Sequence, residues 1–291
     1  MAQKRNFSIV GFTDESALVR AVAERVGIRP LFANESSYRA GEMVVIGPVN
    51  PFRHVLLVTN IWEHAPSVFR TLLLADALRN AGATRVDLLA PWIAYGRQDR
   101  VTVAGEAPAG IVIGRLLAHT FDHMTTLDAH SPEFIRSFRG RLVSVMLLQK
   151  GIQSRRHRIS LVVAPDRGAT ERAKRVARSL RVPFAVITKK RVNGRVVSSC
   201  LDIREKDVLG ARALLVDDIA DSGGTLESAV CVLRSAGAAS VSAFVSHAVD
   251  LTALRSSTKG MLDHVDAAFD HKTKKMSPQV LTALTDAMPR V

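Results

Sequence analysis

The segment from Leu214 to Ala229 combines acidic, glycine and hydroxyl residues in an order that suits a sugar phosphate. It reads LLVDDIADSGGTLESA, which is an apolar strand, two carboxylates and a Ser-Gly-Gly-Thr turn that opens a helix. The two glycines let main-chain N–H groups approach a phosphate without a side-chain clash. The N-terminus of a helix adds N–H donors and partial positive charge. We therefore predict that this loop binds the phosphate of a phosphorylated sugar.

The two acids before the turn, Asp217 and Asp218, are poor neighbours for a phosphate. They are good acceptors for vicinal ribose hydroxyls, directly or through a divalent cation. An ordinary helix cap would explain Ser222. It would not explain two adjacent acids at the end of a buried strand, where isolated carboxylates are costly. The predicted ribose 5-phosphate site comprises Asp217, Asp218, Asp221, Ser222, Gly223, Gly224 and Thr225.

Four further stretches place polar residues at the end of a predicted strand or directly after it. They are LLAPWIAYGRQDR (88–100), TTLDAHSPEF (125–134), VVAPDRGATERAKRVA (162–177) and VITKKRVNGRVVSS (186–199). Arginine forks match phosphate oxygens and stack on purines, and fixed cations stabilise the charge that develops during phosphoryl transfer. Taken singly, each stretch has an ordinary alternative, such as a charged surface loop, a structural histidine or a solvated basic hairpin.

Apolar runs and amphipathic stretches alternate along the chain and must position these residues. Strands are predicted at 54–60, 85–91, 123–130, 160–166, 183–189, 211–218, 240–248 and 265–270, with a first strand near the N-terminus and a polar stretch from 190 to 199. Helices are predicted at 67–83, 108–120, 169–180, 224–237 and 278–288. This alternation predicts an α/β fold whose mainly parallel sheets are flanked by helices, with ligands at the carboxyl ends of the strands.

The chain is long enough for two such domains. At 291 residues, a division into halves of roughly 140 residues is expected. A polar, basic stretch without periodicity, from Gln149 to Arg158, marks the break. We predict two similar domains over 1–148 and 149–275, and a last helix within 276–291 that can pack on either of them.

Composition narrows the class of partner. A net charge of +13 attracts anions such as phosphorylated metabolites. Aromatic residues make up only 5%, so stacking platforms for nucleic acid are not expected and we predict no nucleic-acid partner. No apolar run approaches the ~18 residues of a membrane span, so no membrane partner is predicted. The two cysteines, Cys200 and Cys231, form no CxxC motif, and a reducing cytoplasm is the expected location.

In their order along the chain, these motifs resemble those of the ribose-phosphate diphosphokinases (phosphoribosyl-diphosphate synthases), which have the type I phosphoribosyltransferase-like fold. The RQDR stretch resembles the family signature PYxxYxRQDR, which implies that Arg97, Gln98 and Arg100 bind ATP. The LDAHSPE stretch resembles LDLHxxQ, which implies that His130 contacts the magnesium ion of MgATP. Glu133 replaces the glutamine of that motif.

Two further motifs lie in the second half. APDRGATERA resembles SPDxGGxxRA, which implies that Asp166 holds a divalent cation near the ribose hydroxyls, although Ala169 replaces the second glycine. TKKR resembles the start of the family's catalytic loop, which implies that Lys189 and Arg191 stabilise the transferred group.

Near the N-terminus, the stretch YRAGE resembles the family's adenine-contacting FxDGE. Tyr38 and Glu42 match this pattern and are implied to bind ATP, but Ala40 replaces the aspartate. In the family this loop reaches the ATP of a neighbouring subunit, so the resemblance implies a homo-oligomer.

The resemblance implies a Mg²⁺-dependent transfer of the diphosphoryl group of ATP to C1 of ribose 5-phosphate, which yields AMP. Two alternatives remain. A phosphoribosyltransferase would share the loop from Asp217 to Thr225 but has no use for the RQDR and KKR stretches. A non-catalytic homologue would bind ribose phosphate without turnover, and Ala40 and Ala169 favour it, while Lys189 and Arg191 argue against it.

Overall fold

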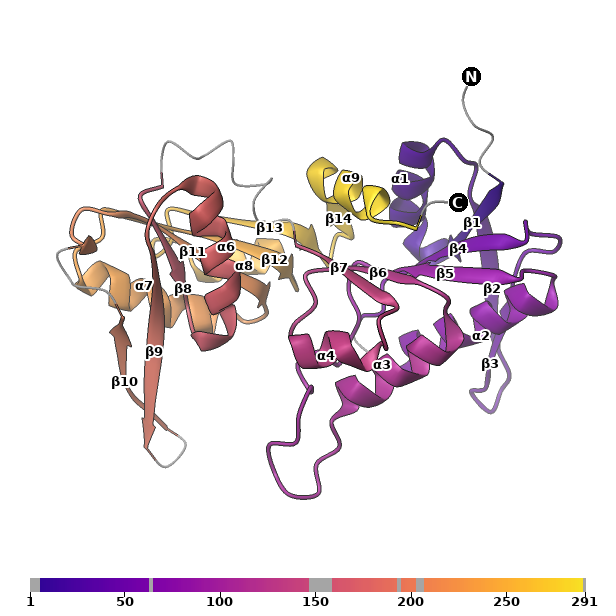
Figure 1. Cartoon of the computed structure of the whole chain (residues 1–291), viewed down its shortest axis with the longest axis horizontal. Helices are drawn as coiled ribbons and strands as arrows, with labels where there is room; N and C mark the ends of the chain where they lie inside the picture. Colours follow the sequence, from indigo (N-terminus) through magenta and orange to yellow (C-terminus); the bar gives the residue numbers. More distant parts are fainter. Residues whose placement is uncertain (1–5, 63–64, 147–158, 193–194, 203–206, 290–291) are drawn as a thin grey trace. The chain divides into compact units, whose positions relative to one another are not determined.

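The computed structural model describes residues 6–62, 65–146, 159–192, 195–202 and 207–289, and describes no side chains from 189 to 201. The chain divides into two compact units (Figure 1). The first runs to Val145 and includes the C-terminal segment from Val280, and the second runs from Met146 to Gln279. The predicted break, from Gln149 to Arg158, lies outside the described residues.

The first unit is built on a seven-stranded sheet with the order β3-β2-β1-β4-β5-β6-β7. Its strands are β1 Phe7–Phe12, β2 Leu31–Ser37, β3 Met43–Ile46, β4 His54–Val58, β5 Arg85–Leu89, β6 Met124–Leu127 and β7 Leu142–Val145. All neighbours are parallel except β3, which pairs antiparallel with β2 through a tight hairpin. The chain reverses its direction of travel across the sheet between β1 and β4, which is the kind of position where ligands bind in such sheets.

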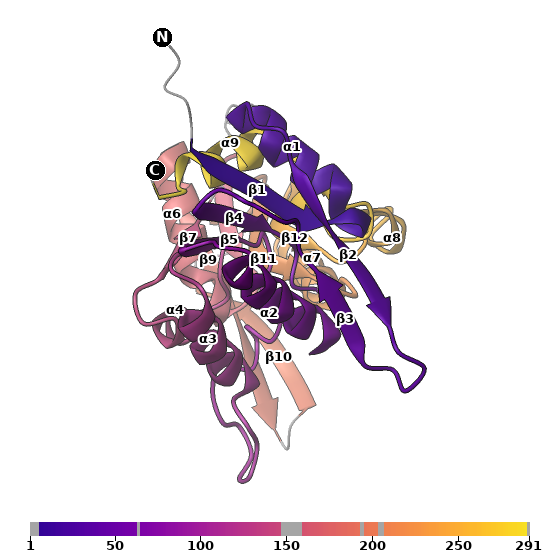
Figure 2. The same ribbon diagram turned by 90° about the vertical axis from the view of Figure 1, so that its right-hand side faces the viewer.

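Helices cover both faces of this sheet (Figures 1 and 2). Helix α1 (Ser16–Val26), preceded by the short turn η1 (Thr13–Glu15), lies with α9 (Pro278–Asp286) on one face. There Nη2 of Arg25 is 4.0 Å from Oδ1 of Asp286. Helices α2 (Ala65–Asn80), α3 (Ala109–Thr120) and α4 (Pro132–Ser137) cover the other face. The last helix of the chain therefore packs on the first unit.

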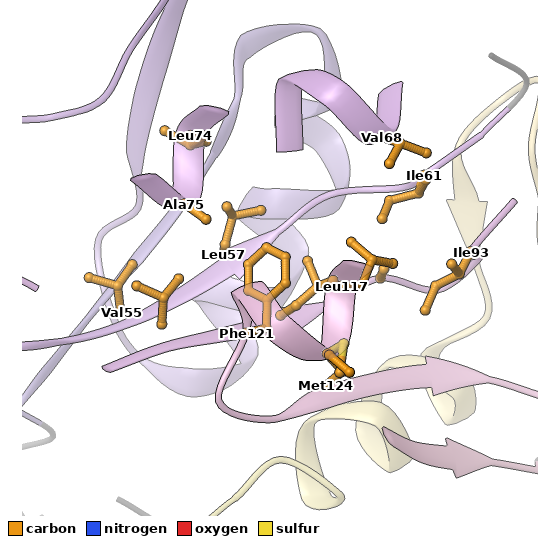
Figure 3. Close-up of a cluster of buried hydrophobic side chains, with 14 of the residues drawn as sticks. Val55, Leu57, Ile61, Val68, Leu74, Ala75, Ile93, Leu117, Phe121 and Met124 are labelled. Carbon is orange, nitrogen blue, oxygen red and sulfur yellow. The ribbon is translucent and has the colours of Figure 1, made fainter. Parts of the chain in front are cut away.

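The core under α2 and α3 explains why these apolar runs become central strands. Leu57 of β4 and Phe121, which ends α3, are fully buried and lie among side chains of both helices (Figure 3). Strands buried on both faces need continuous apolar runs rather than alternation. Removing one Phe of this size from water contributes about 1.5–3 kcal/mol.

The second unit repeats the plan with a seven-stranded sheet in the order β10-β9-β8-β11-β12-β13-β14. Its strands are β8 Leu161–Ala164, β9 Phe184–Val192, β10 Arg195–Leu201, β11 Arg212–Ala220, β12 Ser240–Ala248, β13 His264–Asp270 and β14 Lys275–Met276. Helices α7 (Gly224–Ser235) and α8 (Leu251–Ser257) share one core with Val163 and Leu215. Helix α6 (Thr170–Leu180), which follows the turn η3 (Arg167–Ala169), packs on β8, β9 and β11 from the opposite face.

The α/β class and the parallel sheets flanked by helices are confirmed, although several elements were not predicted, among them α1, β2, β3 and β7, and two predicted segments differ in detail. The stretch after Lys189, predicted to be polar and without a strand, forms an antiparallel hairpin from β9 and β10. Strand β11 continues two residues beyond its predicted end at Asp218, because Ala220 pairs with Ala248 of β12. In both places the partner strand supplies main-chain hydrogen bonds that the hydrophobic periodicity of the sequence does not predict. Within the described part of the chain, no helix is both long enough and apolar enough to cross a membrane.

Candidate functional site

The predicted phosphate loop joins β11 to α7 in the second unit. Residues 221–223 form a bend, and α7 begins at Gly224 with Gly223 as its N-cap in the left-handed region at φ 87°. The first hydrogen bond of the helix runs from the amide of Glu227 to the carbonyl of Gly223, at 2.9 Å. The N-cap residue, Gly223, has no side chain that could cap this end. The amide groups of the first turn therefore face outward in the arrangement that binds anions at helix N-termini.

The two glycines of the loop, Gly223 and Gly224, differ in whether the fold requires a glycine at their position. A Cβ atom on Gly223 would lie 3.1 Å from Cδ1 of Leu254 in α8, and its positive φ would strain any other residue. A Cβ atom on Gly224 would meet only Oγ of Ser222, at 3.9 Å. Gly223 is thus required by the fold, whereas the space in front of Gly224 is open. A glycine at a helix N-terminus that the fold itself does not require is what close approach of a phosphate to the main chain would need.

The two acids of β11 differ in their surroundings. Asp218 is buried, with 4% of its surface exposed, and its Oδ2 lies 3.6 Å from Nη2 of Arg172 in α6. Asp217 is less enclosed, and its Oδ1 accepts a hydrogen bond from the amide of Asp218 at 2.9 Å. Burial, followed by the charges of Asp218 and Asp166, raises the pKa of the Asp217 carboxyl well above its ordinary value. A group with this cost needs a cation or a hydrogen-bond donor to offset it.

Asp166 lies after the neighbouring strand, β8, and belongs to the same cluster of carboxylates because its charge acts on Asp217. Its Oδ1 accepts hydrogen bonds from the amides of Gly168 at 2.8 Å and Ala169 at 3.3 Å, so it caps the turn η3. A cap is a structural role in its own right. The turn leads directly into α6, which carries Arg172.

Lys189 and Arg191 lie on β9, where it runs beyond its neighbour β8. The last pair between the two parallel strands joins Ala164 to Val186. Lys189 and Arg191 pair instead with Ser199 and Val196 of β10. Both residues therefore follow the carboxyl end of the β8–β9 pairing, on the edge of the sheet that also bears Asp166. Their side chains lie outside the described part of the structure.

In the first unit, the RQDR stretch forms a turn after β5 that packs on the start of α3. Tyr95 has a positive φ of 66°, and its carbonyl accepts a hydrogen bond from the amide of Gln98 at 2.9 Å. The carbonyl of Gln98 in turn accepts from the amide of Gly110 at 2.9 Å. The main chain of this turn is thus fixed, while the side chains of Arg97, Gln98 and Arg100 are exposed.

His130 follows the next strand, β6, and lies beside this turn. A Cβ atom built on Gly96 would be 3.5 Å from Cβ of His130 and 3.3 Å from Cε1 of Phe134. The structure therefore brings Arg97, Gln98 and His130 to one edge of the first sheet. These are three of the residues that the sequence resemblance implies for MgATP binding.

Tyr38 and Glu42 are not part of this group. They lie in the turn between β2 and β3, where the amide of Tyr38 donates to the carbonyl of Glu42 at 2.9 Å, and Tyr38 is 66% exposed. Strands β1, β4 and β5 separate β2 from β6. At about 4.8 Å for each strand spacing, this places the two groups roughly 19 Å apart across the sheet. One chain does not bring them together.

The chemistry of the donor set suits Mg²⁺, although the residues described contain no group of three or more histidine, cysteine or acidic side chains able to hold a metal ion. Mg²⁺ is usually bound by one or two carboxylates together with substrate oxygens and water. Asp166 and Asp217, which repel one another in the metal-free chain, match that pattern.

One residue of this region, Arg172, was missed by the sequence reasoning. Arg172 is 6% exposed, and its guanidinium lies beside the carboxylate of Asp218. The signal was present, since the arginine of the SPDxGGxxRA pattern is Arg172. The pairing could not be inferred from the sequence, because the partner, Asp218, lies more than forty positions away and is adjacent to Arg172 only in the fold.

A glycine turn at a helix N-terminus, preceded by acids on a central strand, defines a protein of the phosphoribosyltransferase-like class. Comparison with known families agrees. The family described as the phosphoribosyl transferase domain matches residues 146–274, and the N-terminal domain of ribose phosphate pyrophosphokinase matches residues 7–121.

Individual relatives point the same way. A ribose-phosphate pyrophosphokinase of Thermococcus kodakarensis is 34% identical over 79% of this chain and 80% of its own length. One from Porphyromonas gingivalis is 28% identical over 100% of this chain and 96% of its own. The crystal structure of phosphoribosylpyrophosphate synthetase from Mycobacterium smegmatis has the same fold, with a TM-score of 0.77 and 22% identity over 97% of both chains. The chain belongs to the ribose-phosphate pyrophosphokinase family.

Proposed function

We propose that the protein transfers the diphosphoryl group of ATP to the C1 hydroxyl of ribose 5-phosphate, with 5-phosphoribosyl 1-diphosphate and AMP as products. The observation that carries this proposal is the glycine turn at Gly223 and Gly224, preceded on β11 by Asp217, a carboxyl group whose ionisation is disfavoured by burial and by neighbouring carboxylates. Membership of the ribose-phosphate pyrophosphokinase family supports it.

The second unit supplies the groups proposed for ribose 5-phosphate. The 5-phosphate binds the loop from Asp221 to Thr225, where the amides and the hydroxyls of Ser222 and Thr225 donate hydrogen bonds. Asp217 and Asp218 orient the ribose through its vicinal hydroxyls. Asp166 holds Mg²⁺ beside them, in keeping with the effect of its charge on Asp217.

The first unit supplies the groups proposed for MgATP. Arg97, Gln98 and Arg100 contact the phosphates and the purine from the exposed turn after β5. His130 lies beside the turn and approaches the metal ion of the nucleotide. Tyr38 and Glu42, which one chain places far from this group, contact the ATP of a neighbouring copy. The proposal therefore includes a homo-oligomer.

The chemical step forms a bond between the C1 oxygen of ribose 5-phosphate and the β-phosphorus of ATP. The bond from that phosphorus to the oxygen bridging the α- and β-phosphates breaks, AMP leaves, and the C1 hydroxyl proton passes to water. Mg²⁺ would supply charge neutralisation at the phosphate oxygens. Lys189 and Arg191 neutralise the charge that accumulates on the transferred group, and positioning of the two substrates accounts for much of the remaining rate. The low cysteine content agrees with a cytoplasmic location.

The test is AMP release from ATP and ribose 5-phosphate in the presence of Mg²⁺. AMP formed together with an equal amount of 5-phosphoribosyl 1-diphosphate supports the proposal. Binding of ribose 5-phosphate without AMP would instead identify a non-catalytic homologue, a reading that Ala40 and Ala169 favour. Diphosphate released from 5-phosphoribosyl 1-diphosphate in the presence of a nucleobase would identify a phosphoribosyltransferase.

A further inference from the structure

Arg172 is a nearly fully buried cation at the ribose-phosphate site. Its Nη2 lies 3.6 Å from Oδ2 of Asp218, whose side chain is equally enclosed, with 7% and 5% of the two side chains exposed. Burying two ionised groups is expensive, and apolar residues of the same volume often stabilise a fold as well or better. Stability alone therefore gives little reason for this pair to exist.

The position of Arg172 gives a better reason. It lies on α6, and its Nη1 also reaches the carbonyl of Gly168 at 3.5 Å, in the turn that Asp166 caps. One guanidinium thus contacts the turn after β8 and the acid pair on β11. These two segments carry the carboxylates Asp166, Asp217 and Asp218, and they are connected by parallel pairing only as far as Val163 and Leu215. Beyond that point Arg172 is a side-chain link between them.

We propose that Arg172 is a positioning residue for ribose 5-phosphate, which holds Asp218 and the Asp166 turn in the arrangement that meets the ribose hydroxyls. The inference rests on the proposed function and deepens it at the acceptor half of the site. Arg172 touches neither substrate, and it acts through the groups it orients. A displacement of about 1 Å in such groups is enough to cost on the order of 10²-fold in rate.

The experiment compares variants in the AMP-release assay with the full chain. Arg172→Lys keeps the charge but loses the planar fork, so it cannot reach both segments. We expect its KM for ribose 5-phosphate to rise about tenfold or more, with its KM for ATP within about twofold of the wild type. Arg178→Met, an exposed arginine on the same helix, is the matched control and should change neither constant.

A second variant separates positioning from folding. Arg172→Met alone leaves a buried carboxylate without its cation and is expected to unfold more easily. Arg172→Met/Asp218→Asn removes both charges, so it should melt close to the wild type. It should bind ribose 5-phosphate at least about tenfold more weakly than Asp218→Asn alone, measured as the loss of the thermal shift that this ligand causes, because the turn capped by Asp166 is released as well. A purely structural role would instead give equal thermal shifts in the double variant and in Asp218→Asn.

These readouts distinguish the two proposals. Wild-type KM for ribose 5-phosphate in Arg172→Lys, or equal rises in both KM values, would overturn the positioning role while leaving the proposed function intact. A wild-type chain that releases no AMP would overturn the proposed function. In that case the thermal shift with ribose 5-phosphate still decides the role of Arg172, because a shift retained in Arg172→Lys contradicts it and a shift lost there supports it.

Discussion

The main-chain amide of Asp218 donates a hydrogen bond of 2.9 Å to Oδ1 of Asp217, so one acid of the pair is oriented by the backbone of the other. This bond favours the charged form of Asp217, but burial and the neighbouring carboxylates outweigh it and raise its pKa. The free chain therefore keeps at the site a carboxyl group whose ionisation is unfavourable. Under the proposed function, binding of the sugar or of a cation would relieve this cost.

Asp217→Asn tests that relationship through stability and activity together. A carboxyl group whose pKa is higher in the folded than in the unfolded chain binds more protons when folded. Its contribution to stability is therefore present at low pH and is lost as the pH rises from about 3.8 through the raised value. We expect Asp217→Asn to melt higher than the wild type at pH 8, and to differ little at pH 3. Its kcat/KM for ribose 5-phosphate should fall by about 10²-fold. Lower stability at pH 8 would contradict the account, and the exposed Glu171→Gln serves as the control.

The two glycines of the loop offer a matched pair of substitutions. Gly224→Ala meets nothing closer than 3.9 Å, so it should leave the melting temperature unchanged or raise it slightly, since alanine favours helix. It should still raise the KM for ribose 5-phosphate about tenfold if a phosphate approaches this backbone. Gly223→Ala should in addition lose about 1–2 kcal/mol of unfolding free energy through its positive φ. Urea unfolding and AMP kinetics check both, and unchanged KM in Gly224→Ala would argue against a phosphate at this turn.

Lys189→Ala tests the proposed stabilisation of the transferred group. Loss of one fixed cation at the developing charge should lower kcat on the order of 10³-fold, with smaller changes in the KM for either substrate. Lys174→Ala, which removes a partly exposed lysine paired with Glu171 on α6, is the control and should keep wild-type kcat. Turnover that survives Lys189→Ala would remove this residue from the mechanism.

Asp87 provides a test of stability in the first unit, away from the site. Its buried carboxylate in β5 lies 2.9 Å from Nε2 of His54 and 2.8 Å from Nη2 of Arg85. Burial opposes ionisation, but the hydrogen bonds from His54 and Arg85 prevail and lower the pKa of Asp87. This contribution to stability is present above the ordinary value near 3.8 and is lost as the pH falls through the lowered one.

Asp87→Asn should therefore lower the free energy of unfolding at pH 7 by about 3 kcal/mol, as expected for a broken buried pair. The difference from the wild type should shrink as the pH falls below 3.8. Urea titrations across this range measure it, with Asp76→Asn on the surface of α2 as the control. A difference that does not depend on pH would show that shape, and not charge, makes the contribution.

The separation of Tyr38 and Glu42 from His130 predicts that subunits complement one another. Glu42→Ala and Lys189→Ala chains should each be nearly inactive alone. Hetero-oligomers purified by two different tags should regain part of the activity, because some sites then combine an intact Glu42 from one copy with an intact Lys189 from another. Hetero-oligomers that stay inactive, or a wild-type enzyme that is fully active as a monomer, would contradict the shared ATP site.

Much of the fold was predictable because the place of each central strand in its sheet agrees with the hydrophobic pattern of its own residues. The run that became β8 is apolar throughout, and those that became β4, β5 and β12 are mainly apolar, as strands buried on both faces tend to be. The hairpins β2–β3 and β9–β10 were not predicted. They lie at an edge of each sheet, and their pairing comes from a partner strand and not from hydrophobic periodicity, although β3 is apolar and the first half of β9 was predicted as a strand.

The candidate site likewise has one part that the sequence predicts and another that only the fold brings together. By itself, the sequence determined the chemistry of the loop from Asp217 to Thr225, because two glycines before a helix and two acids after an apolar run constrain the backbone and the charge locally. Only the tertiary structure decided that Asp218 pairs with Arg172, that Gly223 but not Gly224 is required by packing, and that Tyr38 lies far from His130. Those relationships join residues that are distant in sequence, and they arise from the order of strands in the sheet and from which helix covers each face.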